Sequence, residues 1–191
     1  MRISGGKARG IRLAVPTGDR VRPATDGLRQ AVFSSLGERV RGARFLDLFA
    51  GSGAYGLEAL SRGASGGRFV EKHPAVLALL KKNVAAVSKS AGVDASAIEV
   101  SGGDAVLAEP GAGVAPDLVF VDPPYEIIPE VGGRILSAIT AWPAPDPDRL
   151  VVFEMPGEMT VAAPGWWEFK RLGRGAKQPT VAFFRPVAAA R

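Results

Sequence analysis

The chain has 191 residues, of which 47% are hydrophobic, so its length favours a single domain with a full hydrophobic core. It contains no cysteine and one histidine, which excludes disulfides and thiolate metal sites and leaves too few ligands for zinc. It shows no signal peptide and no apolar run near the ~18 residues of a membrane span, so we expect a cytoplasmic protein without a membrane partner.

The net charge of +5 is unevenly distributed along the chain. Residues 1–44 carry a net charge of +7, and the remaining residues carry −2. Nine of the ten basic residues in this first segment are arginines, whose planar guanidinium groups match phosphate well. The segment therefore favours an electrostatic contact with nucleic acid, and a solvated basic arm is the alternative.

The basic segment precedes a regular alternation of strands and helices. Residues 1–25 are strand- and turn-like, and Asp26 is placed to cap a helix that ends near Glu38. From residue 45 on, apolar runs predict five strands, at residues 45–49, 68–71, 97–100, 117–121 and 150–154. Helical spacing predicts helices between them, at residues 54–62, 74 to about 87 and 131–141. This order predicts a parallel sheet covered on both faces.

The last part of the chain breaks this alternation. Residues 166–170 and 180–184 read as two strands, joined by a segment with glycine and proline and no helix. We therefore expect a terminal antiparallel hairpin. The whole pattern divides the chain into a basic N-terminal extension, residues 1–44, and an α/β domain, residues 45–191.

A glycine-rich loop, residues 51–56, follows the first strand and opens the next helix. It fits the pattern G-x-G-x-x-G, and Glu71 lies 20 residues after Gly51 at the end of the second strand. This spacing is the fingerprint of a dinucleotide site, where a helix N-terminus binds pyrophosphate. Asp47 stands at the mouth of the loop, where a carboxylate repels pyrophosphate and favours a cation. The loop and Asp47 together favour S-adenosylmethionine, which carries a sulfonium and no phosphate, over NAD.

Three acidic side chains near the ends of neighbouring strands are assigned to this cofactor. Asp47 faces the cation, Glu71 can accept the ribose hydroxyls, and Asp104 is placed to reach the adenine amino group. The alternatives are a buried or helix-capping acid at 47, a surface acid at 71 and an ordinary turn at 104. The residues expected to contact the cofactor are Asp47, Phe49, Gly51, Ser52, Gly53, Glu71, Lys72, Asp104, Ala105 and Asp122.

Asp122-Pro123-Pro124-Tyr125 follows the apolar fourth strand. The prolines fix two φ angles and remove two N–H donors, while their carbonyl groups remain acceptors. Asp122 adds a carboxylate, and Tyr125 adds a flat aromatic face. Such a pocket suits a planar base held by its exocyclic amino group, and a simple turn after a strand is the alternative. The predicted catalytic residues are Asp122, Pro123, Pro124 and Tyr125.

Further motifs extend over nearly the whole chain. In the α/β domain, the motifs that include the loop and the tetrapeptide are residues 47–53, 56–64 and 122–125. The N-terminal motif consists of Arg2-Ile3, Gly5-Gly6, Arg9-Gly10, Leu13, residues 22–26 and Arg29. Many amino-methyltransferases share the glycine loop and the tetrapeptide, whereas the N-terminal motif is family-specific. In this combination the chain resembles the bacterial 16S ribosomal RNA guanine-N2 methyltransferase D family.

The resemblance implies a Rossmann-like class I methyltransferase, with a mostly parallel seven-stranded sheet and a C-terminal antiparallel hairpin. It implies S-adenosylmethionine-dependent methylation of the N2 amino group of one guanine in 16S rRNA. The expected partner is that rRNA or the small ribosomal subunit, contacted by residues 1–44, and we expect a monomer without a metal ion. The residues expected to bind RNA are Arg9, Arg12, Arg22, Thr25, Asp26 and Arg29.

Other functions fit parts of the same pattern. A DNA adenine-N6 methyltransferase also uses Asp-Pro-Pro-Tyr, although 191 residues leave little room for a DNA-recognition domain. An NAD-dependent dehydrogenase conflicts with Asp47 and lacks a suitably placed catalytic histidine. A non-catalytic RNA-binding protein conflicts with the intact glycine loop and tetrapeptide.

Overall fold

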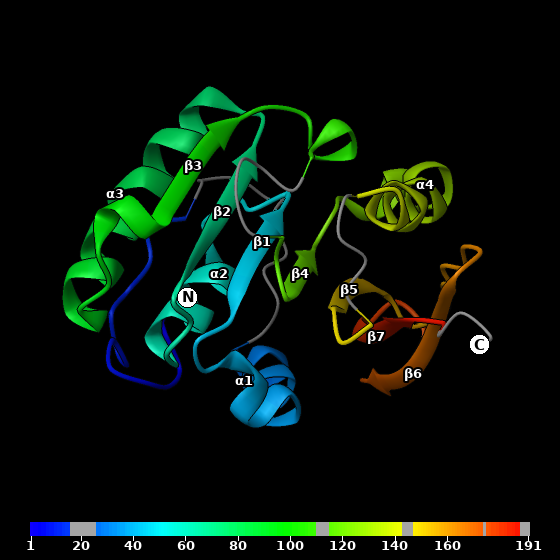
Figure 1. The fold of residues 1–191 in the computed structure, drawn as a ribbon, viewed down its shortest axis with the longest axis horizontal. Helices are drawn as coiled ribbons and strands as arrows, with labels where there is room; N and C mark the ends of the chain where they lie inside the picture. Colours follow the sequence, from blue (N-terminus) through cyan, green and yellow to red (C-terminus); the bar gives the residue numbers. More distant parts are fainter. Residues whose placement is uncertain (16–25, 110–114, 143–146, 174, 188–191) are drawn as a thin grey trace.

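The computed structural model describes residues 1–15, 26–109, 115–142, 147–173 and 175–187. Within these residues, seven strands form one sheet in the order β3-β2-β1-β4-β5-β7-β6 (Figure 1). The strands are β1 (Arg44–Leu48), β2 (Gly66–Glu71), β3 (Ile98–Gly102), β4 (Leu118–Val121), β5 (Leu150–Pro156), β6 (Trp166–Leu172) and β7 (Pro179–Pro186). The helices are α1 (Asp26–Leu36), α2 (Ala54–Ser61), α3 (Pro74–Ala91) and α4 (Ile128–Thr140), with short 3-10 helices η1 (Gly37–Val40), η2 (Ala95–Ala97), η3 (Ala105–Leu107) and η4 (Tyr125–Ile127).

The strand pairing confirms the predicted architecture. β1 pairs in parallel with β2 and β4, β2 pairs in parallel with β3, and β4 pairs in parallel with β5. β7 runs antiparallel to both β5 and β6. The molecule is therefore a Rossmann-like α/β fold whose parallel sheet ends in an antiparallel hairpin.

Two hydrophobic layers cover the sheet, one on each face. On one face, α1, α2 and α3 pack against strand residues such as Phe45, Phe69 and Phe120. On the other face, α4 packs against Leu48 and Phe153 (Figure 1). Side chains alternate between the faces of a strand, so strands covered on both sides are apolar throughout, which explains the runs in the sequence. Among the described helices, none is long and apolar enough to cross a membrane.

Several elements end at positions different from those predicted, and glycines account for most of the differences. α1 ends at Leu36, because Gly37 has a φ of 54°, which an α-helix does not accommodate. α3 continues past residue 87 to Ala91 and ends before Gly92, which has a φ of 70°. β2 begins earlier than predicted, at Gly66, because a glycine carries no apolar signal in the sequence.

Residues 1–15 lie against α2 and α3. The predicted strand character of this segment is limited to one antiparallel bridge, between Arg2 and Arg12. The Asn83 side chain of α3 holds Ala14 through two hydrogen bonds of 2.8 Å, one to its N–H and one to its carbonyl oxygen. Apolar residues of the segment join the core formed by α1, α2 and α3; these are Ile3, Ala8 and Leu13. The N-terminal segment is thus packed onto the same face as those helices.

Candidate active site

Carboxylates from four adjacent strands lie at the carboxyl edge of the sheet. Glu71 ends β2, Asp47 lies in β1, Asp122 follows β4 and Glu154 lies in β5. Open α/β sheets bind ligands at this edge. In the described part of the chain, no three acidic, histidine or cysteine side chains are arranged to hold a metal ion. Carboxylates accept hydrogen bonds, so the edge is suited to ligands that carry hydrogen-bond donors.

The predicted catalytic tetrapeptide lies directly after β4. The Asp122 N–H donates to the Leu48 carbonyl at 3.5 Å, which extends the β1–β4 pairing by one residue. Pro123 is buried, Pro124 is exposed, and Tyr125 is half-buried at the start of η4. The structure thus brings the four residues together between the sheet edge and solvent.

Asp122 has the electrostatics of a proton acceptor. Burial of its carboxyl group raises its pKa well above the usual range, and the negative charges of Glu154 and Asp47 raise it further. A carboxylate with a raised pKa is a stronger base than an exposed one. The residue as a whole is half-buried.

Glu154 belongs to this group, although the sequence analysis did not identify it. It is 1% exposed and accepts a hydrogen bond from the Tyr55 hydroxyl at 2.7 Å and a long one from the Tyr125 hydroxyl at 3.4 Å. Burial raises its pKa to about 6, although Tyr55, Tyr125 and Arg29 each act to lower it. The available signal was an acid in an otherwise apolar strand, since a buried carboxylate requires partners.

The glycine loop has a backbone conformation that suits residues without bulky side chains. Gly51 and Gly53 have φ angles of 53° and 83°, and Phe49 is a non-glycine residue with a φ of 59°. A Cβ on Gly53 would lie 2.6 Å from Cδ1 of Leu80, so the loop packs directly on α3. Such conformations concentrate at ligand-binding sites. The loop is therefore a candidate ligand-binding turn.

Asp47 is buried and holds the end of the glycine loop through a hydrogen bond. This corrects the prediction that its carboxylate stands at the mouth of the loop. It is 2% exposed, and its Oδ2 accepts the Gly56 N–H at 2.9 Å. Burial raises its pKa to about 8, with a further contribution from the charge of Glu71 and an opposing one from the Gly56 N–H. The buried, hydrogen-bonded acid of the alternative interpretation describes Asp47.

Glu71 connects the loop to the end of β2. Its two carboxylate oxygens accept the Gly51 N–H at 3.0 Å and the His73 N–H at 2.8 Å. A carboxylate oxygen can accept more than one hydrogen bond, so Glu71 retains capacity for ligand hydroxyls. Its predicted role at a ribose stays a prediction.

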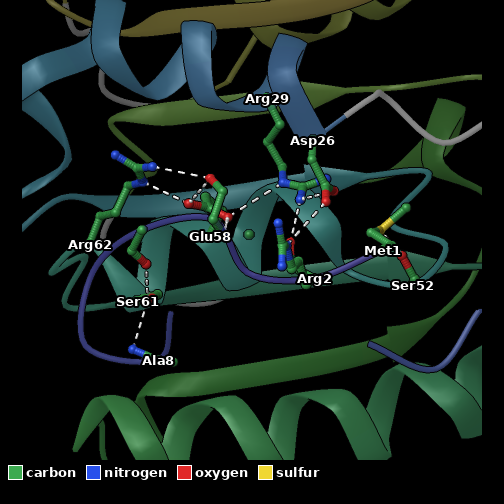
Figure 2. Close-up of polar contacts among 12 residues, drawn as sticks. Met1, Arg2, Ala8, Asp26, Arg29, Ser52, Glu58, Ser61 and Arg62 are labelled. Atoms are coloured by element: carbon green, nitrogen blue, oxygen red, sulfur yellow. Dashed lines mark hydrogen bonds and ion pairs between the residues drawn. The ribbon is translucent and has the colours of Figure 1, made fainter. Parts of the chain in front are cut away.

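The other predicted cofactor residues lie around the ends of β1, β2 and β3. Asp104 is exposed and caps η3 by accepting a backbone N–H of that helix at 2.9 Å. Ala105 is buried in the core on the α4 face, and Lys72 is exposed. Ser52 is buried, and its hydroxyl donates to the Met1 sulfur at 3.3 Å. Ser52 thereby connects the loop to the N-terminus (Figure 2).

The predicted RNA-binding residues have different locations. Arg9 and Arg12 are exposed on the N-terminal segment. Arg22 and Thr25 lie outside the described residues. Asp26 is the first residue of α1, and its carboxylate lies 2.8 Å from Nη2 of Arg29.

Arg29 is fully buried, which corrects the prediction that it contacts RNA. Its side chain points from α1 toward α2, where its Nε lies 3.4 Å from the buried Glu58 (Figure 2). Its Nη2 also donates to the Arg2 carbonyl. A buried guanidinium requires anionic partners, and one of its two, Glu58, comes from a helix distant in sequence. Arg29 therefore joins α1, α2 and the N-terminal segment.

Comparisons with known proteins find relatives of this chain and of its fold. A family model described as conserved hypothetical protein 95 matches residues 1–184. Ribosomal RNA small subunit methyltransferase D of Escherichia coli is 41% identical over 125 residues, which cover 65% of this chain and 60% of that protein. The Haemophilus influenzae protein of the same name is 31% identical over 167 residues, covering 87% and 84%. A solved Escherichia coli structure, provisionally described as a methyltransferase, superposes with a TM-score of 0.78 at 32% identity and covers 99% of each chain.

Proposed function

The chain belongs to the family described as conserved hypothetical protein 95, the family of ribosomal RNA small subunit methyltransferase D, and on this premise we propose that it methylates small-subunit ribosomal RNA. The methyl donor is S-adenosylmethionine, and the target is the N2 amino group of one guanine. The observation that carries the proposal is the Asp122-Pro123-Pro124-Tyr125 segment at the end of β4, beside the buried Glu154.

S-adenosylmethionine fits the residues at the carboxyl edge better than a phosphate-bearing cofactor does. Gly51 and Gly53 keep the loop after β1 free of side chains, and Glu71 offers a carboxylate for ribose hydroxyls. Asp104 follows β3, where an adenine amino group needs an acceptor. The Glu71 carboxylate beside the loop favours a cation and disfavours pyrophosphate. The bound cofactor would supply an electrophilic methyl group on a positively charged sulfur.

The pocket after β4 supplies positioning and hydrogen-bond acceptors. An exocyclic amino nitrogen is a weak nucleophile, because its lone pair is delocalised into the ring. In the proposed mechanism, Asp122 and the Pro123 carbonyl accept its two hydrogens and draw that lone pair out of conjugation. Tyr125 stacks on the base. The nitrogen must lose a proton when it gains the methyl group, and the raised pKa of Asp122 suits it to accept that proton.

The substrate side of the proposal rests on the N-terminal segment. Arg9 and Arg12 are exposed there and are proposed phosphate contacts, with Arg22 and Thr25 following in the sequence. The target base must leave its stack to enter the pocket, which costs less in an RNA loop than in a duplex. An unpaired loop of the small-subunit rRNA is therefore the proposed target.

Nucleoside mass spectrometry tests this function directly. The protein is incubated with labelled S-adenosylmethionine and small ribosomal subunits that lack the modification, with the Asp122→Ala variant as control. Labelled N2-methylguanosine, absent with the variant, is the expected result. Labelled N6-methyladenosine would reassign the base, and unlabelled nucleosides throughout would reject ribosomal RNA as substrate.

A further inference from the structure

The chain contains two tyrosines, and both donate hydrogen bonds to Glu154. The Tyr55 hydroxyl lies 2.7 Å from Oε2 of Glu154, and the Tyr125 hydroxyl lies 3.4 Å from Oε1. Glu154 is 1% exposed, so water competes little for these contacts. One buried carboxylate of β5 thus bridges two phenol groups, one from α2 and one from η4.

The two ends of this bridge differ in rigidity. Tyr55 is buried at the start of α2, and its ring stacks on Phe120 of β4 with centroids 5.5 Å apart and planes 16° apart. Tyr125 is half-buried in a three-residue helix that follows the exposed Pro124. The 3.4 Å contact of Tyr125 is long for a hydroxyl and a carboxylate. Tyr125 is therefore the adjustable end of the bridge, and Tyr55 is the fixed end.

The bridge lies among charged groups from the surrounding elements. Arg29 of α1 lowers the pKa of Glu154 and that of Tyr55, against the larger effect of burial, which raises both. Asp122 after β4 also raises the pKa of Tyr55. Next to burial, the charge of Glu154 is the largest influence that raises the pKa of Asp122, followed by that of Asp47 in β1. Removing the charge of Glu154 therefore has an electrostatic consequence that a simple packing defect lacks.

We propose that Glu154 is a positioning residue that orients the Tyr125 ring for stacking on the incoming base, with Tyr55 as its fixed anchor beside the glycine loop. The identity of the base rests on the proposed function, whereas the bridge itself does not depend on a substrate. Orienting the ring before the base arrives removes that ordering step from the barrier. Hydrogen bonds at catalytic sites are often long without substrate and shorten in the complex, so stacking draws Tyr125 toward Glu154.

NMR of ring-labelled tyrosine tests the bridge without substrate, because the chain has only two tyrosines and therefore two sets of ring signals. Tyr55→Phe and Tyr125→Phe assign them. In Glu154→Gln we expect both signals to shift and ring flips of Tyr125 to accelerate by about tenfold or more. The matched control Glu168→Gln, which removes a strand carboxylate paired with Arg171, leaves both signals unchanged. A Tyr125 signal that is insensitive to Glu154→Gln would overturn the proposal.

Single-turnover methylation of small ribosomal subunits tests the consequence for the reaction. Glu154→Gln and Tyr125→Phe are each expected to slow methyl transfer about 10- to 100-fold, while affinity for S-adenosylhomocysteine stays within about twofold. The double variant is expected to be no slower than the slower single variant, because both changes remove the same contact. The acid limb of the rate profile moves to lower pH in Glu154→Gln, because Asp122 loses a neighbouring negative charge.

Two outcomes separate this inference from the proposed function. Additive losses with an unmoved acid limb would make Glu154 a structural residue and overturn the inference alone. If the wild-type protein methylates no guanine, the proposed function fails, and the NMR comparison still decides whether Glu154 orders Tyr125.

Discussion

At the scale of single residues, surroundings give the same residue type different tasks. Asp122 is half-buried, and burial together with nearby negative charges raises its pKa, which suits it to the proposed contact with a substrate amino group. Asp47 is enclosed and gives an oxygen to the Gly56 N–H. Asp122 is therefore suited to a role in the proposed reaction, whereas Asp47 supports the glycine loop, which is the candidate cofactor site.

Replacing Asp122 by Asn keeps the shape of the side chain and removes its negative charge. We expect methyl transfer to fall by about 10²- to 10⁴-fold, because the amino group loses its charged acceptor. Affinity for S-adenosylhomocysteine should change by less than about threefold. Single-turnover kinetics and calorimetry measure the two quantities. A loss of affinity as large as the loss of rate would assign Asp122 to cofactor binding instead.

Asp47 gives the protein an unusual dependence of stability on pH. Its pKa is raised from 3.8 to about 8, so the folded state retains a proton that the unfolded chain releases. Between those values its contribution to stability falls as pH rises. Asp47→Asn keeps an acceptor for the Gly56 N–H and cannot ionise. We therefore expect the unfolding free energy of Asp47→Asn to fall less steeply with rising pH than that of the wild type. The two slopes should differ by at most ~1.4 kcal/mol per pH unit.

Urea denaturation of wild type and Asp47→Asn at about pH 5 and about pH 7.5 checks this slope, since both values lie between the two pKa limits. Glu71→Gln is expected to reduce the decline in part, because the charge of Glu71 contributes to the raised pKa of Asp47. An identical slope in wild type and Asp47→Asn would contradict the prediction.

At the scale of elements, α2 connects the glycine loop to the N-terminal segment. Its first turn follows the glycine loop, and Asp47 accepts the N–H of Gly56 there. Further along, Ser61 accepts the Ala8 N–H at 2.9 Å, and Glu58 accepts the Ser4 N–H at 2.8 Å (Figure 2). A single short helix thus holds both the loop and the N-terminal segment.

Glu58→Gln tests how much this connection contributes to stability. Glu58 and Arg29 are both 0% exposed, so the change removes the buried one of the two carboxylates that pair with the Arg29 guanidinium, and the half-exposed Asp26 remains. Breaking such a pair typically costs about 3–5 kcal/mol, and we expect the free energy of unfolding to fall by that order. Glu38→Gln is the control, because its pair with Arg41 is solvent-exposed and contributes little. Equal midpoints in urea for the two variants would refute the importance of the buried link.

At the scale of the whole molecule, the two signs of charge have different places. Residues 1–44 carry a net charge of +7, whereas residues 45–191 carry −2. Phosphates are attracted to the first and repelled by the second. This division favours an RNA that rests its backbone on the N-terminal segment and extends a base into the pocket.

The double variant Arg9→Ala/Arg12→Ala tests this division. Both side chains are exposed, so their loss should leave folding intact and weaken RNA binding. The slope of log affinity against log salt should fall by about one to two, because two phosphate contacts are lost. Arg134→Ala on α4 is the matched control, since this exposed arginine lies on the other face of the sheet. Titrations at several salt concentrations with equal slopes for all three proteins would place the RNA elsewhere.

The fold was predictable because its signals are local. Apolar runs and helical spacing indicated five strands, the intervening helices and the terminal hairpin, and the sheet order confirms them. The ends of elements were less predictable where they fall at glycines. Gly37 and Gly92 end helices, and Gly66 begins a strand although it has no apolar side chain. The glycine loop and Asp122-Pro123-Pro124-Tyr125 could be recognised because neighbours in sequence make their shapes.

The amino-acid sequence by itself determined which segments are candidates for chemistry, since φ restrictions, missing N–H donors and short spacings act between adjacent residues. Only the tertiary structure decided the roles of Arg29, Asp47 and Glu154. Each is buried, and each needs a partner from a distant element: Glu58 for Arg29, the start of α2 for Asp47, and two tyrosines for Glu154. Burial makes an unpaired charge costly, so long-range packing, which the sequence does not display, determines what a buried charged residue can do.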